Sequence, residues 1–172
     1  MRSTETKTPT AEFEGPVLVI GYGNILRGDD GAGPAAAEKL RERLPRQTAE
    51  VLAVHQLLPE LVEPLRRSKL AIFIDADWNI PPGEVQKRDL RVKNEGPAAI
   101  GHHQSPENLL KMAKELYGHA PPAMLFHIGA SEFGYHEGLS KPVRHAVALL
   151  VKEVLDTVRA ACGEPCKEPH HA

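Results

Sequence analysis

Long apolar runs, a strong net charge and abundant cysteine are what this sequence lacks. No apolar run reaches the roughly 20 residues that cross a bilayer, so no membrane span is expected. The formal net charge of -2 offers no basic surface to nucleic acid or to an acidic lipid layer. Residues 1–14 are polar and lack the apolar core of a signal peptide, which predicts a cytoplasmic protein.

The two cysteines, Cys162 and Cys166, lie close together near the end of the sequence. Their spacing does not match a zinc ribbon, and we expect two reduced thiols in a flexible tail. A metal role together with His170 and His171 is the weaker alternative.

What the sequence does contain is a regular alternation of apolar runs with helix-like segments. This alternation predicts an α/β protein: one three-layer α/β/α domain with a mostly parallel, twisted sheet of about five strands, including an edge strand. We expect the domain over residues 15–162, a disordered arm over 1–14 and a flexible tail over 163–172. The expected strands are Val17–Ile20, Glu50–His55, Leu70–Ile74, Glu84–Val92 and Ala123–Ile128. The expected helices are Ala35–Leu44, Leu58–Arg67, Pro106–Tyr117 and Lys141–Ala161. Ser105 and Ser140 are the expected N-caps of the last two helices.

A glycine-rich loop, Gly21–Gly33, follows the first strand and contains two adjacent carboxylates, Asp29 and Asp30. A dinucleotide site is not expected, because Gly28 comes too late to complete the G-x-G-x-x-G pattern and the two acids would repel a pyrophosphate. The sequence also has no Gly-Lys-Ser/Thr phosphate loop. Two interpretations remain open: the acids cap the following helix, or they belong to a ligand site at the carboxyl end of the sheet.

The third strand also leads into acids, Asp75 and Asp77. In a doubly wound sheet the first and third strands can lie side by side, so the carboxyl ends of these two strands can converge. Asp75 directly follows the apolar run and is expected to be partly desolvated, whereas Asp77 fits a solvated strand end. Two carboxylates brought together there would repel each other, and a bound cation would relieve that repulsion.

His102 and His103 lie in an expected loop before a helix rather than on an apolar helix face. An imidazole from this loop and the two strand-end carboxylates make a mixed oxygen and nitrogen set, which suits a divalent metal such as nickel or zinc. Of the other histidines, His55 is a candidate for the same cleft, and His127 is expected to be packed within a strand. A serine nucleophile is not supported, because no Gly-x-Ser-x-Gly elbow occurs.

Four parts of the sequence, taken in order, carry a family resemblance. They are Gly21–Asn24 with Arg27–Gly33, then Ile74–Ala76, then His102–Pro106 with Leu109 and Leu110, and finally Gly138–Ser140. They resemble the hydrogenase maturation proteases, the endopeptidases that trim the C-terminus of the nickel–iron hydrogenase large subunit. The resemblance extends from about Val17 to Leu155 and implies a five-stranded sheet flanked by helices.

The resemblance also implies a site. Two acids and a histidine contact the metal in that family, and they carry over to Asp30, Asp75 and His102, with His103 as the alternative histidine. The family often has glutamate where this chain has Asp30, which is one methylene shorter. Nickel is the implied metal, presented by the large-subunit precursor, which is the implied partner. Asp30, Asp75 and His102 are then the catalytic residues: the metal polarises the scissile carbonyl or activates a water, and Asp29 or Asp30 is the base.

Two other functions remain compatible with the sequence. A metal-dependent aminopeptidase or amidohydrolase acting on small substrates would hold its metal tightly after purification. A nickel-binding assembly chaperone would bind the precursor without changing the mass of the precursor. Elemental analysis and mass measurement therefore distinguish both alternatives from the endopeptidase.

Overall fold

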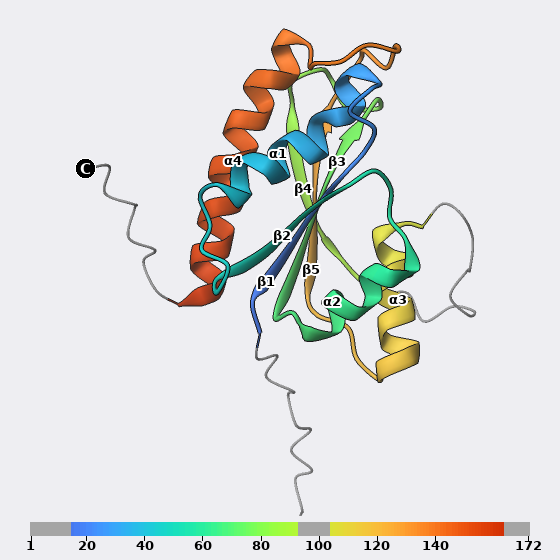
Figure 1. The fold of residues 1–172 in the computed structure, drawn as a ribbon, viewed down its shortest axis with the longest axis vertical. Helices are drawn as coiled ribbons and strands as arrows, with labels where there is room; N and C mark the ends of the chain where they lie inside the picture. Colours follow the sequence, from blue (N-terminus) through green and yellow to red (C-terminus); the bar gives the residue numbers. More distant parts are fainter. Residues whose placement is uncertain (1–14, 93–103, 164–172) are drawn as a thin grey trace, which may run out of the picture.

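A central sheet of mostly apolar, often β-branched strands dominates the structure of this protein. The structure is a computed structural model that describes residues 15–92 and 104–163. The strands are β1 (Val17–Tyr22), β2 (Ala49–Val54), β3 (Leu70–Asp77), β4 (Val85–Leu90) and β5 (Ala123–Gly129). They form a sheet in the order β2-β1-β3-β5-β4, in which β4 is antiparallel to β5 and the other neighbours are parallel (Figure 1). The predicted fold class is confirmed, and β1 and β3 are neighbours.

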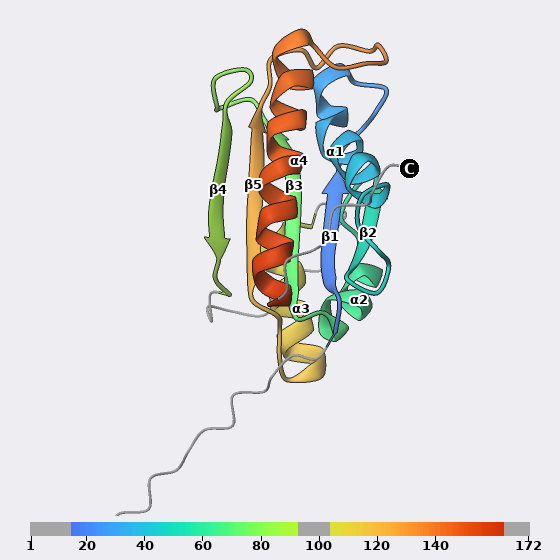
Figure 2. The same ribbon diagram turned by 90° about the vertical axis from the view of Figure 1, so that its left-hand side faces the viewer.

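Helices cover both faces of the sheet, as Figure 2 shows for the face under α1 and α4. α1 (Ala32–Arg41) and α4 (Lys141–Cys162) bury one apolar cluster, which includes Val19, Ile72 and Phe126. α2 (Val62–Arg67) and α3 (Pro106–Tyr117) cover the other face, and two short 3-10 turns, η1 (Gly28–Gly31) and η2 (Pro59–Leu61), precede α1 and α2. Within the described ranges, no helix combines the length and the apolar character needed to cross a membrane.

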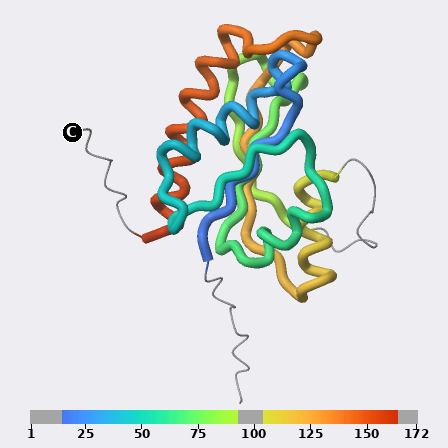
Figure 3. The backbone as a smooth tube through the Cα atoms, viewed as in Figure 1, coloured from blue at the N-terminus to red at the C-terminus, as the bar shows by residue number. Residues whose placement is uncertain are grey.

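The path of the chain explains where a site can form. Figure 3 shows the chain leaving β1 near the middle of the sheet, passing through α1 to β2 and returning past β1 to β3. The strand order therefore reverses between β1 and β3, since β2 lies beside β1 on one side and β5 and β4 follow β3 on the other. In open α/β sheets, the crevice at such a reversal is the usual ligand site.

Several predicted boundaries need correction. β3 continues through Asp77 instead of ending at Ile74, because its last residues pair with β5, Asp75 with His127 and Asp77 with Gly129. α1 begins at Ala32 and ends at Arg41, earlier at both ends than predicted. The arm predicted over 1–14, and the tail predicted over 163–172 apart from Gly163, lie outside the described residues.

Two glycines bring α1 directly against the ends of β1 and β3. A Cβ atom on Gly33 would lie 2.4 Å from the carbonyl oxygen of Tyr22 and 2.5 Å from that of Ile74. A Cβ atom on Gly21 would lie 2.1 Å from the carbonyl oxygen of Gly33. Only glycine permits this approach, which places η1 and its two acids over the carboxyl edge of the sheet.

The two edge strands are protected in different ways. On β2, the Arg41 side chain of α1 donates from Nε and Nη2 to the carbonyl oxygen of Val51, at 3.3 and 3.2 Å. On β4, the four residues from Gln86 to Asp89 are all polar or charged and all exposed. Charged and occupied edges of this kind oppose pairing with another strand.

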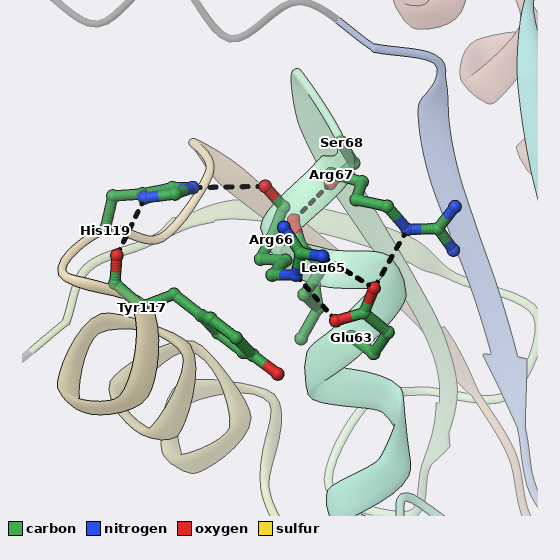
Figure 4. Close-up of polar contacts among 7 residues, drawn as sticks. All are labelled: Glu63, Leu65, Arg66, Arg67, Ser68, Tyr117 and His119. Carbon is green, nitrogen blue, oxygen red and sulfur yellow. Dashed lines mark hydrogen bonds and ion pairs between the residues drawn. The ribbon is translucent and has the colours of Figure 1, made fainter.

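Polar contacts join α2 to α3, the helix that begins beside the candidate site (Figure 4). Glu63 accepts a hydrogen bond from Arg66 Nε at 2.6 Å, and the Arg66 guanidinium lies 5.0 Å from the centre of the Tyr117 ring. His119 places one ring nitrogen 3.2 Å from the Tyr117 carbonyl oxygen and the other 3.1 Å from that of Arg66. These contacts fix the far end of α3, while the Ser105 N-cap accepts from Asn108 N at its start, as predicted.

Candidate active site

Asp30 and Asp75 line one small cavity at the carboxyl edge of the sheet. Its volume is about 210 Å³, and its walls come from β1, η1, β3, the loop after β2 and the segment before α3. The lining residues are Tyr22, Gly23, Asp30, His55, Gln56, Leu57, Asp75 and Gln104. The convergence predicted for the ends of the first and third strands is therefore confirmed, and His55 faces the same cavity, as expected.

Asp75 lies in a row of polar side chains that crosses the sheet. β1 pairs with β3 at Gly21 and Ile74, which places Tyr22 beside Asp75, and Asp75 in turn pairs with His127 of β5. The Tyr22 side chain is hydrogen-bonded to Asp75, and one oxygen of Asp75 accepts from the N–H of Ala76 at 2.8 Å.

Burial raises the pKa of Asp75 to about 7, the nearby carboxylates Asp30 and Asp77 add to the increase, and the hydrogen bonds from Tyr22 and Ala76 oppose it. Burial also raises the pKa of Tyr22, helped by the adjacent negative charge of Asp75, so the phenol keeps its proton. A carboxyl group with a pKa near neutrality gains or loses a proton readily at physiological pH.

Asp30 is half-buried on η1 and faces the cavity with part of its carboxylate uncommitted. Its Oδ2 atom accepts a hydrogen bond from the backbone N–H of Asn24 at 2.8 Å, which ties the loop after β1 to η1. Gly23 makes this fold of the loop feasible, because its φ of 139° is a left-handed value that other residues rarely adopt. Asp30 is thus held by the backbone while remaining open to a ligand.

Asp29 has a structural role that differs from the predicted one. The side chain is fully buried and accepts from Ser140 N at 2.7 Å, Glu132 N at 3.0 Å, Ser140 Oγ at 3.0 Å and Ser131 N at 3.2 Å. Burial by itself would raise the pKa of Asp29, but these hydrogen bonds outweigh it and lower the pKa. Asp29 therefore caps neither α1 nor its own turn: it joins η1 to the β5–α4 loop and to the start of α4.

Asp77 and His127 form a pair beside the cavity rather than in its wall. The Oδ2 atom of Asp77 lies 3.6 Å from Nδ1 of His127, and its Oδ1 atom accepts from Asn79 N at 2.8 Å. Burial lowers the pKa of His127, while the charge of Asp77 opposes that shift. His127 is packed within its strand, as expected, and Asp77 is less solvated than predicted.

The two predicted loop histidines, His102 and His103, lie outside the described residues. Gln104 directly follows them, is buried and lines the cavity together with Asp30 and Asp75. Within residues 15–92 and 104–163, no group of three or more His, Cys, Asp or Glu side chains is arranged to hold a metal ion. Cys162 is a free thiol at the end of α4, whereas Cys166, His170 and His171 lie beyond the described residues.

Sequence reasoning missed Tyr22 and Gln104 as members of the site. Tyr22 had a usable signal, because alternation along β1 puts it on the same face as Leu18 and Ile20, next to Asp75. Gln104 had only its position between the histidines and the N-cap of the next helix. Neither glutamine nor tyrosine belongs to the acid and imidazole set that a metal site suggests.

The sequence of this chain is similar to that of a known protein, although no family model matches the chain. The hydrogenase expression/formation protein HupD of Bradyrhizobium diazoefficiens is 30% identical over 148 residues, which cover 81% of this chain and 76% of that protein.

Solved structures with the same fold include two proteins that process hydrogenases. The hydrogenase maturating endopeptidase HybD from E. coli is 26% identical with a TM-score of 0.66, and the match covers 85% of this chain and 93% of HybD. The NiFe hydrogenase maturation protease HycI from Thermococcus kodakarensis has a TM-score of 0.69, with coverage of 86% and 96%. At 23% identity, HycI supports the fold alone.

The sheet topology places the chain among the doubly wound α/β proteins, and the cavity lined by Asp30 and Asp75 lies where the strand order reverses. The chain belongs to the hydrogenase maturation protease family. It is accordingly an endopeptidase, as the sequence resemblance implied.

Proposed function

We propose that this protein removes the C-terminal extension of a nickel–iron hydrogenase large-subunit precursor after nickel has been inserted. In this proposal Asp30, Asp75 and His102 contact the nickel that the precursor carries. Nickel is then part of the substrate, and the protein acts only on a precursor that has received it.

The observation that supports the proposal is the shared cavity of Asp30 and Asp75. Two carboxylates, Asp30 of η1 and Asp75 of β3, face one space of about 210 Å³, and the charge of Asp30 raises the cost of ionising Asp75. A divalent ion entering that space relieves the repulsion and favours the ionised form of Asp75. Nitrogen and oxygen ligands together suit nickel, and the histidine loop leads directly into the cavity-lining residue Gln104.

The surroundings of the acids favour Asp30 over Asp29 as the proposed base. Asp29 is fully buried and its two oxygens accept four hydrogen bonds, so it has no access to a water molecule in the cavity. Among the described residues, only Asn24 donates a hydrogen bond to the Asp30 carboxylate, through Oδ2, and Asp30 lines the cavity. In the proposed reaction, the nickel carried by the precursor would polarise the scissile carbonyl, and water would add to its carbon atom while Asp30 accepts a proton from that water. Asp30 would then give this proton to the amide nitrogen as the C–N bond breaks, so that the nitrogen leaves as an amine and the carboxylate is restored.

The test is cleavage of purified precursor, loaded or not loaded with nickel, followed by mass spectrometry of the precursor. We expect a single C-terminal fragment from the loaded precursor alone. The variant Asp30→Ala should reduce the rate by at least about a hundredfold, because it removes both a ligand and the base. The matched variant Asp89→Ala, which removes a carboxylate from the exposed strand β4, should leave the rate unchanged. Equal cleavage of both precursors would refute the proposal.

The histidine requires a separate comparison, since His102 and His103 are adjacent. We expect His102→Ala to abolish cleavage and His103→Ala to retain it. The opposite result would assign the ligand role to His103 and leave the rest of the proposed nickel-contacting site unchanged. Retention of full activity by both single variants and by the double variant would remove the histidine from the proposed site.

A further inference from the structure

An apolar groove of about 610 Å³ lies next to the acid cavity. The groove is formed by the loop after β1, the first half of α1 and the end of β2. Its walls are mostly aliphatic, and Glu38 is the one acid among them. The lining residues are Gly23, Asn24, Ile25, Leu26, Pro34, Ala35, Glu38, Ala53, Val54 and His55.

The groove and the acid cavity share part of their walls. Gly23 and His55 line both spaces, so the two meet at the ends of β1 and β2. The loop after β1 contributes to both spaces. Its residue Asn24 lines the groove, and the backbone N–H of Asn24 donates to Oδ2 of Asp30, the candidate base. A ligand in the acid cavity therefore lies within one or two residues' length of the groove.

The rim of the groove leaves two aliphatic side chains in water. Ile25 is 60% exposed and Leu26 is 52% exposed, although most aliphatic side chains of this domain are buried. Adjacent exposed aliphatic residues beside a concave apolar surface are typical of a binding site rather than of an ordinary loop.

We propose that this groove binds an aliphatic side chain of the substrate polypeptide, from a residue one or two positions away from the bond that is cut. This inference rests on the proposed function, because it takes the acid cavity as the place of cleavage. Successive side chains of an extended chain point to opposite sides. A chain that crosses Gly23 thus presents one residue to the acids and its neighbour to the groove.

The chemistry of the two spaces argues for an aliphatic occupant. A charged side chain would lose its hydration against the walls of Leu26, Pro34 and Val54, and an acidic one would also be repelled by Glu38. A further cavity, between Pro16 and Val51, is lined by Arg41 and Arg46 and shares no lining residue with the acid cavity. The groove is thus the apolar surface that a chain bound at the acids meets first.

The test fills the groove and measures cleavage of a nickel-loaded large-subunit precursor that the wild-type protein cuts. Ala35→Leu adds three carbon atoms to the α1 wall, and Ala53→Leu does the same from β2. Ala160→Leu is the matched control, since it places the same side chain on the exposed surface of helix α4. Thermal unfolding of each variant confirms that it folds.

We expect Ala35→Leu and Ala53→Leu to lower kcat/KM by about tenfold or more, mainly through KM, because the groove binds and does not react. The control should match the wild type. The residues near the cut bond of the precursor are then changed to glycine one at a time. At one of these positions, glycine should restore most of the rate of the Ala35→Leu variant relative to wild type. That position should hold an aliphatic residue in the original precursor.

Three results would overturn the inference. If the wild type cuts no nickel-loaded precursor, the proposed function fails and this inference fails with it. If the wild type cuts and both groove variants cut equally well, the groove alone is excluded as a subsite. If the groove variants change only the oligomeric state measured by size-exclusion chromatography, the groove binds a second copy of the chain instead.

Discussion

Asp29 and Asp30 are neighbours in the chain, yet their surroundings are opposite. Asp29 is fully buried and accepts four hydrogen bonds, whereas Asp30 is half-buried and accepts one, from Asn24 N. The first therefore serves the stability of the fold, and the second is available for chemistry. Two variants that differ by one position should separate these roles.

We expect Asp29→Asn to lower the free energy of unfolding by about 3 kcal/mol, because the NH2 group of asparagine donates and cannot accept the hydrogen bonds made by the carboxylate oxygen that it replaces. Asp30→Asn should change stability by less than about 1 kcal/mol while reducing cleavage. Urea unfolding at neutral pH measures both. Since the pKa of Asp29 is lowered from 3.8, its stabilisation is present above that value and declines as the pH falls below it. Equal losses of stability in the two variants would contradict the assignment.

The raised pKa of Asp75 predicts that its contribution to stability changes with pH in the opposite direction to that of Asp29. The pKa of Asp75 is raised from 3.8 to about 7, so between these values the unfolded chain loses the proton first. The contribution of Asp75 to stability is therefore greatest below pH 4 and falls as the pH rises to 7. The total change is roughly 4 kcal/mol at most, from about three pKa units.

Asp75→Asn should remove this decline, because asparagine resembles the protonated acid in shape and carries no charge. Urea unfolding of the metal-free wild type and variant at pH 5 and pH 8 should show the variant gaining stability relative to the wild type at pH 8. Asp156→Asn, on the exposed face of α4, is the control and should follow the wild type at both values. A constant difference between Asp75→Asn and the wild type would contradict the raised pKa.

At the scale of elements, the close packing of α1 on β1 and β3 depends on Gly33. Replacing a helical glycine with alanine usually stabilises a helix by about 1 kcal/mol. Here the added Cβ atom would lie about 2.5 Å from two carbonyl oxygens, and both belong to backbone that cannot move aside easily. We expect Gly33→Ala to destabilise the protein by about 2 kcal/mol or more.

The measurement is the midpoint of thermal unfolding, and the pair Lys39→Ala and Lys39→Gly, at an exposed position of the same helix, calibrates the ordinary cost of glycine in α1. If α1 shifts to make room, η1 shifts with it, and cleavage should fall further than stability alone explains. An increase in the unfolding midpoint for Gly33→Ala would show that the approach of α1 is not tight.

The elements also show what sequence reasoning can reach. Ser140 was predicted as an N-cap, and it occupies that position, but its side chain donates to Asp29 and makes no capping bond. That contact spans 111 positions, and no local pattern contains it. β3 was predicted to end at Ile74, where the apolar run stops, yet pairing with β5 extends it to Asp77.

The fold class and the meeting of Asp30 with Asp75 could be predicted, because strand order and strand ends follow from hydrophobic alternation and from the topology of doubly wound sheets. The roles of Tyr22 and of the apolar groove could not, because they depend on which loop and helix side chains meet in space. The choice of His102 rather than His103 as the metal ligand stays a prediction, since neither residue lies in the described part of the chain.

For the whole molecule, the proposed source of the nickel gives a prediction that separates this protein from a metal-dependent aminopeptidase or amidohydrolase. If nickel arrives with the precursor, protein treated with a chelator and then freed of it should cut the nickel-loaded precursor at the untreated rate. A hydrolase with a resident metal would lose its activity and regain it with added metal. Rates before and after treatment, with elemental analysis of the treated protein, give the answer.

The protection of both sheet edges has a consequence for how a polypeptide substrate can be received. Peptides that bind by β-augmentation need a free row of N–H and C=O groups along an edge strand. Arg41 occupies the carbonyl oxygen of Val51 on β2, and β4 presents charged, solvated side chains. Both edges therefore oppose the addition of a sixth strand. In the proposed function, the substrate polypeptide would instead cross the strand ends, with its main chain unpaired and open to hydrolysis.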